Sequence, residues 1–209
     1  MLKPTYVIPA LPPPVDIETV RVLKALARAS RALADLKGQA KTIPNQGILI
    51  DTLALQEAKA SSEIENIVTT QDEVFQADLF PDDPQSPAAK EVALYRDALR
   101  LGYARLRETG GLIPNSALID MFRLLKGRDD GFRVTPGTAL KHEQTGAIVF
   151  VPPQDARDIV THMSALEKFI NDDAFCALDP LIKMALIHHQ FESIHPFPDG
   201  NGRIGRILN

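Results

Sequence analysis

The sequence predicts a mainly α-helical protein with one short β-hairpin, and three observations support this fold class. Most of the chain consists of segments whose apolar residues recur at helical spacing. Two short runs, 132–135 and 147–151, have strand character and are separated by a turn-rich segment. A chain of 209 residues with 44% hydrophobic and 24% charged residues is typical of a globular protein and can bury one sizeable core.

The first half of the chain is predicted to form three helices, each with apolar residues at helical spacing: 16–38, about 48–60, and 88–107. Asp16 is the expected N-cap of the first helix, and Gly38 is its expected stop. Prolines make the segment 80–87 a loop. We therefore expect two units, an N-terminal helical region at 1–87 and a core at 88–209.

The core is predicted to contain helix 88–107 and three more full helices: 113–126, 155–171, and 181–194. The hairpin lies between the first two of these, with a turn at 143–146 and a closing pair of prolines at 152–153. Pro196 and Pro198 end the last of the three helices, because proline removes backbone donors. A short final helix is expected to begin near Gly202.

The loop after residue 194 combines a titratable group with a backbone suited to anions. His195 lies at the predicted helix-to-loop boundary, and an unperturbed histidine with a pKa of about 6.5 can accept a proton near neutral pH. Gly200 and Gly202 allow backbone turns that let the amides around Asn201 converge on an anion. The segment therefore predicts a general base beside a phosphate-binding nest.

Two arginines and one carboxylate complete this pattern. Arg203 and Arg206 are three residues apart, so on a helix both guanidinium groups share one face and suit a polyphosphate. Asp199 is a hard oxygen ligand, and magnesium is commonly held by one or two carboxylates plus substrate phosphates. Taken singly, each feature is more often structural than functional, but together they are difficult to regard as independent. Phe197 is the exception, because its apolar side chain is best explained as an anchor into the core.

These residues match, at every specified position, the signature His-x-Phe-x-Asp/Glu-Gly-Asn-Gly-Arg-x-x-Arg, and the chain therefore resembles the Fic family. The resemblance implies a Fic fold and the transfer of AMP from ATP to a Ser, Thr or Tyr hydroxyl of a target protein, with Mg²⁺ as cofactor. It implies His195 as the catalytic base and Asp199 as the metal ligand. The residues implied to bind ATP are Gly200, Asn201, Gly202, Arg203 and Arg206. It also implies that the hairpin at 132–151 docks the target protein.

A second pattern lies at Ser61, Glu65 and Asn66, which fit Ser/Thr-x-x-x-Glu-Gly/Asn and resemble the inhibitory helix of many Fic proteins. Ser61 and Glu65 would share one helix face. The Glu65 carboxylate could then pair with Arg206 and occupy the guanidinium that otherwise holds the terminal phosphate of ATP. This predicts a built-in brake, whereas the alternative is an ordinary helix with an exposed glutamate.

Composition excludes several other classes. The five prolines of residues 1–14 predict an extended arm rather than a secretory signal, and the sequence lacks an apolar run of membrane-spanning length, so we expect a cytoplasmic protein. The single Cys176 excludes an intrachain disulfide and disfavours a zinc cluster. A net charge of −4 gives no support for nucleic-acid binding. Self-modification and homo-oligomers are compatible with the sequence.

Three alternatives remain open at this level. A relative with the same phosphate-binding nest could transfer a different phosphate-containing group. It could also remove AMP, with Glu65 positioning a water molecule. Glu192 and His195 have the Glu-x-x-His spacing of carboxylate-bridged metal sites, although a second copy is missing. The chain could also be a non-catalytic regulatory module. Fic cores normally continue beyond the second arginine, whereas this sequence is apparently cut short after the motif, so either it is a fragment or the site is poorly held.

Overall fold

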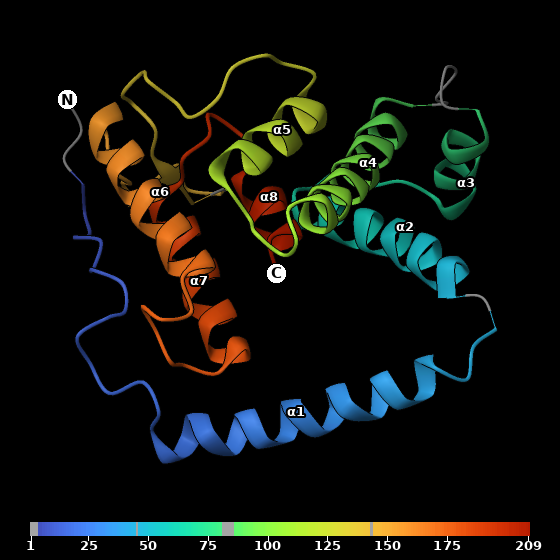
Figure 1. The fold of residues 1–209 in the computed structure, drawn as a ribbon. Helices are drawn as coiled ribbons and strands as arrows, with labels where there is room; N and C mark the ends of the chain where they lie inside the picture. Colours follow the sequence, from blue (N-terminus) through green and yellow to red (C-terminus); the bar gives the residue numbers. More distant parts are fainter. Residues whose placement is uncertain (1–3, 45, 81–85, 143) are drawn as a thin grey trace.

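The computed structural model describes residues 4–44, 46–80, 86–142 and 144–209, and in these ranges it forms eight helices and one two-stranded antiparallel sheet (Figure 1). The helices are α1 (Val20–Ala40), α2 (Gln46–Ile64), α3 (Gln71–Leu79), α4 (Pro87–Glu108), α5 (Asn115–Lys126), α6 (Ala156–Asn171), α7 (Pro180–Ile194) and α8 (Asn201–Ile207). The strands are β1 (Leu140–Lys141) and β2 (Ile148–Phe150). The predicted fold class, helical with a short hairpin, is confirmed.

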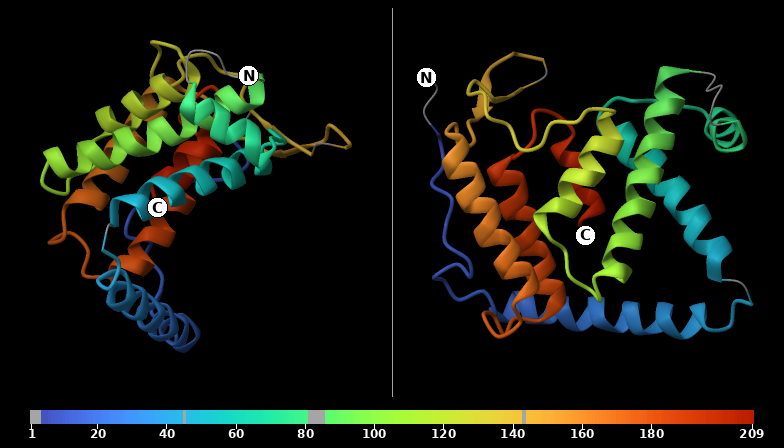
Figure 2. Two further views of the ribbon diagram at one scale, coloured as in Figure 1. Left: turned by 90° about the vertical axis from the view of Figure 1, so that its right-hand side faces the viewer. Right: turned by 45° about the horizontal axis from the view of Figure 1, so that its top comes forward.

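The short helix α8 lies at the centre of the molecule. It packs against α7, α4, α2 and α5, so helices from both halves of the sequence converge on it. Figures 1 and 2 show α6 and α7 side by side on one flank, α2 and α3 on the other, and the long helix α1 running below them. Within the described ranges, no helix combines the length and apolar character needed to cross a membrane.

Capping explains where two helices differ from the predicted ranges. Helix α1 begins at Val20 rather than at residue 16, because the Thr19 side chain, not that of Asp16, accepts a hydrogen bond from a first-turn amide. The helix also continues past Gly38 to Ala40, because a glycine inside a helix weakens it without ending it.

Helix α3 was not predicted from apolar periodicity. Its start is fixed by a capping box, in which the Thr70 side chain accepts from the Glu73 amide and the Glu73 carboxylate accepts from the Thr70 amide. Helix α2 is longer than predicted and ends at Ile64. The segment that begins at Ser61 is therefore the last turn of α2 and the residues directly after it.

The first strand of the hairpin was predicted at the wrong place. Strand β2 pairs with 140–141, with Leu140 opposite Phe150, and not with 132–135. The earlier segment instead runs beside the loop after α7, where the Arg133 amide donates to the Pro196 carbonyl at 2.8 Å. Its backbone is thus bonded to the predicted active-site loop rather than to β2. Residue 143, in the predicted turn, and residues 81–85, in the predicted loop before α4, lie outside the described residues.

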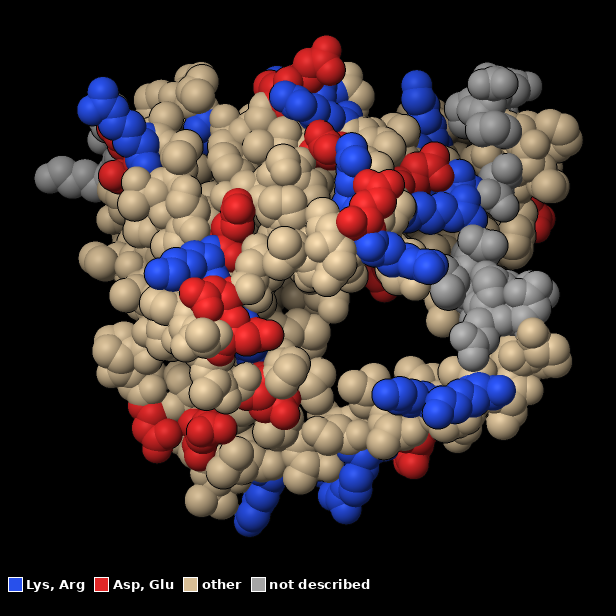
Figure 3. Space-filling view, viewed as in Figure 1, with Lys and Arg blue, Asp and Glu red and all other residues tan. Residues whose placement is uncertain are grey.

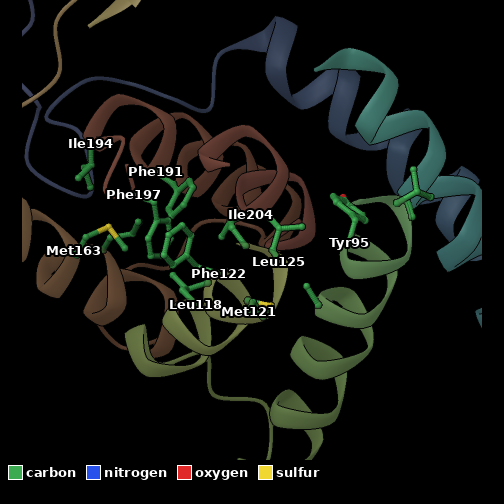
Figure 4. Close-up of a cluster of buried hydrophobic side chains, with 14 of the residues drawn as sticks. Tyr95, Leu118, Met121, Phe122, Leu125, Met163, Phe191, Ile194, Phe197 and Ile204 are labelled. Carbon is green, nitrogen blue, oxygen red and sulfur yellow. The ribbon is translucent and has the colours of Figure 1, made fainter. Parts of the chain in front are cut away.

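The core forms around Phe197, which is fully buried (Figure 4). Its ring stacks on Phe122 of α5, with 4.3 Å between the ring centroids and 8° between the planes. Phe132 and Phe191 pack around the same ring at tilted angles. The interpretation of Phe197 as an anchor into the core is confirmed.

Replacement of Phe197 by alanine is expected to destabilise the fold by roughly 3–5 kcal/mol, because it removes a fully buried aromatic side chain and leaves a cavity. Chemical denaturation would measure the loss. The control is Phe80→Ala, since Phe80 is 63% exposed and its removal should cost far less. Equal losses for the two variants would contradict this account of the core.

Candidate active site

His195 is the residue that ends helix α7. Its amide bonds to the Phe191 carbonyl at 2.9 Å, and its backbone adopts the left-handed conformation, with φ 51° and ψ 59°. This conformation turns the chain sharply into the loop of Pro196 and Pro198. The predicted helix-to-loop boundary is confirmed, and the imidazole remains 18% exposed at the edge of the site.

The imidazole of His195 is neutral at physiological pH. Burial lowers its pKa to about 4, and the guanidinium of Arg133 acts in the same direction. The backbone carbonyl of Glu192 and the carboxylates of Glu65 and Asp199 act in the opposite direction without reversing the shift. A neutral imidazole has a lone pair available to accept a proton.

The glycine-rich turn places the start of α8 beside this histidine. Gly200 has φ +75°, which a side chain would strain, and α8 begins at the next residue. The side chain of Asn201 is 1% exposed and turns into the loop, where it accepts from the Phe197 amide and donates to the Phe197 carbonyl, both at 2.8 Å. The structure thus shows Asn201 holding the loop closed with its side chain.

Arg206 meets the end of helix α2, as the sequence pattern predicts. Its Nη2 lies 2.8 Å from Glu65 Oε1, its Nε donates to Ser61 Oγ at 2.6 Å, and Nη2 also donates to the Ser61 carbonyl at 3.0 Å. Asn66 follows with φ 61°, so the chain turns away directly after the glutamate. The predicted contact between Glu65 and Arg206 is therefore present.

Gly202 allows this contact to form. A Cβ atom at this position would lie 2.6 Å from Glu65 Oε1 and 3.2 Å from Arg206 Nη1. The absence of a side chain at Gly202 therefore brings the carboxylate of Glu65 close to the first turn of α8.

Arg203 has a different environment from Arg206. It is 3% exposed, and its Nη1 lies 2.7 Å from Glu91 Oε2 on helix α4. This pair joins α8 to α4. It also keeps the Arg203 guanidinium under the turn at Gly200, where a Cβ atom on the glycine would lie 3.8 Å from Arg203 Nη2.

Asp199 pairs with a lysine that the sequence pattern did not indicate. Its Oδ2 lies 2.6 Å from Lys126 Nζ, at the end of helix α5, and its Oδ1 accepts from the Gly200 amide at 2.7 Å. Burial alone would raise the pKa of Asp199, but Lys126 and the Gly200 amide hold it below its ordinary value.

The donor set around Asp199 fits a magnesium ion that arrives with a nucleotide. In the described part of the chain, no group of three or more His, Cys, Asp or Glu residues could hold a metal by itself. Asp199 is 65% exposed and ionised, so one carboxylate can be added to phosphate and water ligands. The Glu192 carboxylate and the His195 ring are 4.0 Å apart, but the companion ligands of a carboxylate-bridged site are missing from the described residues.

Three residues near the site were not found from the sequence: Glu91, Lys126 and Arg133. Each lies far along the chain from its partner, by 112 residues for Glu91 and Arg203 and by 62 for Arg133 and His195. Spacing rules operate within one helix or one turn, so they give no signal for such pairs. On the face shown in Figure 3, basic and acidic side chains are interspersed over the upper part of the molecule.

Comparison with known proteins identifies relatives of both parts of the chain. A sequence model of the Fic/DOC family N-terminal region matches residues 23–104, and one of the Fic/DOC family matches residues 116–209. The protein adenylyltransferase Fic of Drosophila melanogaster is 30% identical over 91 residues, which cover 44% of this chain and 18% of that protein. A probable protein adenylyltransferase of Aquifex aeolicus is 61% identical over 31 residues, or 15% of this chain and 10% of that protein.

Solved structures share the fold at low sequence identity. A Fic family protein from Desulfovibrio desulfuricans has a TM-score of 0.67 at 20% identity, and the match covers 99% of this chain and 58% of the Desulfovibrio chain. Fic-1 of Caenorhabditis elegans, residues 134–508, has a TM-score of 0.66 at 21% identity and covers 91% of this chain and 57% of its own. The chain thus matches somewhat more than half the length of these structures and a much smaller share of the curated relatives.

Replacement of Lys126 by methionine is expected to raise the pKa of Asp199, because the cation that favours its ionised form is removed. NMR titration of the Asp199 carboxyl carbon would measure the change. Lys183→Met is the matched control, since Lys183 forms a 2.9 Å pair with Asp173 and not with Asp199. An Asp199 pKa that is the same in the Lys126 variant and the wild type would contradict the assignment.

Proposed function

Because this chain belongs to the Fic/DOC family, we propose that it is a protein adenylyltransferase, which transfers AMP from ATP to a Ser, Thr or Tyr hydroxyl of a target protein. The observation that carries the proposal is a neutral, partly exposed His195 next to the turn at Gly200 and the start of α8. The curated relatives with this activity in their names support the same class of reaction.

In the proposed reaction the target hydroxyl attacks the α-phosphorus of ATP in line with the leaving group. The imidazole of His195 accepts the hydroxyl proton while the new oxygen–phosphorus bond forms. The bond between the α-phosphorus and the oxygen that bridges to the β-phosphate breaks, and pyrophosphate leaves with the electron pair. Because the pKa of His195 is lowered to about 4, the ring is already in its proton-accepting form at neutral pH.

The phosphates would be held by the first turn of α8 and its arginines. The backbone of Gly200, Asn201 and Gly202 would face the anion, and Arg203 and Arg206 would supply positive charge. Bound Mg²⁺ would neutralise charge on the phosphates and on the departing pyrophosphate. Asp199 would be its protein ligand.

In this proposal Glu65 acts as a brake on the reaction. The contact that supports it is the 2.8 Å pair with Arg206, which is reinforced by two hydrogen bonds to Ser61. An Arg206 guanidinium held by Glu65 is not available to the terminal phosphate of ATP. A nucleotide bound without that contact would place its α-phosphate out of line for attack, and misplacement by about an ångström can cost roughly a hundredfold in rate.

The hairpin would orient the target protein. Strand β2 ends beside the N-terminal arm, where the Thr5 amide donates to the Val151 carbonyl at 3.1 Å and the Val151 amide donates to Thr5 Oγ1 at 3.0 Å. One backbone hydrogen bond directly after this strand is thus already made by a segment of the chain itself. An extended stretch of a target that pairs in the same way would present its hydroxyl near α7.

A division into a regulatory region at 1–87 and a catalytic core at 88–209 fits this arrangement.

Replacement of Glu65 by glycine is expected to raise the rate of AMP transfer on the order of a hundredfold, because Arg206 is released to bind phosphate. Self-labelling with ATP and Mg²⁺ would measure it, with label on the α-phosphate compared with label on the γ-phosphate. Glu63→Gly is the matched control, since Glu63 lies in the last turn of α2 and pairs with Lys59, not with Arg206.

The same experiment separates the alternative functions. Label from the γ-phosphate would indicate a phosphotransferase, and release of AMP from a modified protein would indicate the reverse activity. Nucleotide binding without any label in the Glu65 variant would favour a regulatory module and would contradict the proposal.

Transfer by the Glu65→Gly variant is expected to be insensitive to pH between about 8 and 5.5 and to fall as the pH approaches 4. The reason is that the pKa of His195 is lowered to about 4 in the presence of Glu65, and removal of this carboxylate, which raises the pKa, leaves it no higher. Single-turnover rates across this range would measure the profile. A rate that has fallen to half of its maximum near pH 6.5 would contradict the lowered pKa of His195. Transfer that survives in the His195→Ala variant would contradict the role of His195 as the base.

A further inference from the structure

Arg133 lies beneath the loop that carries His195. It is 4% exposed, although arginine is among the residues that are rarely buried unless they are paired. Its Nε donates to the His195 carbonyl at 2.8 Å, and its Nη2 donates to the carbonyls of Ile194, at 3.4 Å, and Pro153. Its own amide donates to the Pro196 carbonyl at 2.8 Å. One residue therefore bonds to three successive carbonyls of the catalytic loop.

Two of the carbonyls that Arg133 contacts, those of Ile194 and His195, belong to the C-terminal end of α7. The last carbonyls of a helix lack partners within the helix and carry partial negative charge. A guanidinium offers several donors in a fixed plane and can bind more than one of these oxygens at once. The side chain of Arg133 thus satisfies the carbonyls of Ile194 and His195 at the point where the helix stops.

This point is also where the backbone is strained. His195 has φ 51°, a conformation that favours glycine and costs free energy for a residue with a side chain. Such a conformation persists only when the surrounding structure holds it. The hydrogen bonds from Arg133 to the carbonyls on either side of the bend provide that restraint.

We propose that Arg133 is a positioning residue for the transfer reaction, because its guanidinium holds the carbonyls of Ile194 and His195 and thereby fixes the direction of the imidazole. This inference rests on the proposed function for its kinetic consequence. Arg133 does not contact the reacting atoms, and it acts through the backbone of His195.

Arg133 also influences the charge of the imidazole. The groups that face His195 are Arg133, Glu192 on α7, Glu65 after α2, and Asp199 in the loop. Arg133 is the cation among them, and its field favours the neutral ring, whereas the carbonyl of Glu192 and the two carboxylates favour the protonated ring. Removal of the guanidinium charge would therefore shift the pKa of His195 upward.

The test compares Arg133→Met and Arg133→Lys in the Glu65→Gly background. The methionine variant should lose roughly ten- to a hundredfold in kcat, with KM for ATP changed less than about twofold, because Arg203, Arg206 and the turn at Gly200 remain in place. Its rate should also fall at a higher pH than that of the parent. The lysine variant keeps the positive charge but cannot bond several carbonyls at once. Its kcat should therefore fall, while its rate should decline at the same low pH as that of the parent.

Arg128→Lys is the matched control, because Arg128 precedes the same segment but pairs with Asp130 at 2.7 Å on the surface. It should retain the kinetics of the parent. NMR titration of the His195 ring without nucleotide provides a readout that does not require turnover, and its pKa should rise in Arg133→Met. If the parent itself transfers no AMP, the proposed function fails, while the titration still decides whether Arg133 acts on His195.

Thermal unfolding shows whether each variant is folded. A folded Arg133→Met with unchanged kcat and an unchanged His195 titration would overturn the proposal. If the methionine variant does not fold, the lysine variant tests the proposal instead. An unchanged kcat in Arg133→Lys would then overturn the proposal.

Discussion

The burial of Phe197 is the constraint on which the site depends. Its ring fills the centre of the core against Phe122, and its backbone amide and carbonyl are both bonded to the side chain of Asn201. The loop between α7 and α8 is therefore fixed at its middle by packing and closed by hydrogen bonds. This attachment helps to place His195 before the anchor and the turn at Gly200 after it.

A second feature of the site is that three of its cations pair with carboxylates of the same chain. Arg203 pairs with Glu91 of α4, Lys126 of α5 pairs with Asp199, and Arg206 pairs with Glu65 after α2. These pairs also join helices from distant parts of the sequence around α8. They are not equivalent, however. Arg203 is 3% exposed and serves the packing of α8 on α4, whereas Arg206 and Glu65 are 21% and 39% exposed.

Sequence reasoning succeeded where the signal was local. Helical periodicity located the long helices of the core, the prolines located the end of α7, and the apolar character of Phe197 in a polar loop indicated its anchoring role. The sequence pattern also predicted the contact of Glu65 with Arg206, which lie 141 residues apart. That prediction depended on a family resemblance rather than on spacing.

Sequence reasoning failed where the structure depends on contacts between residues distant in sequence, or where the local signal is weak. Residues 132–135 have strand character, yet Arg133 bonds to the loop after α7, and β2 pairs with residues 140–141 instead. Helix α3 is only nine residues long, too short for apolar periodicity to distinguish it. The Thr70 and Glu73 pair could have indicated its start. By contrast, nothing near Lys126 or Glu91 in the sequence marks them as neighbours of the motif.

The left-handed backbone of His195 has an evolutionary consequence. Helices commonly end in a glycine at such a position, since glycine adopts positive φ without a steric penalty. A chain selected for stability alone would therefore be expected to replace this histidine with glycine and would lose the proposed proton acceptor. Under the proposed function, the fold accepts a local loss of stability at a residue whose side chain accepts a proton, so activity and stability would be opposed there by backbone geometry.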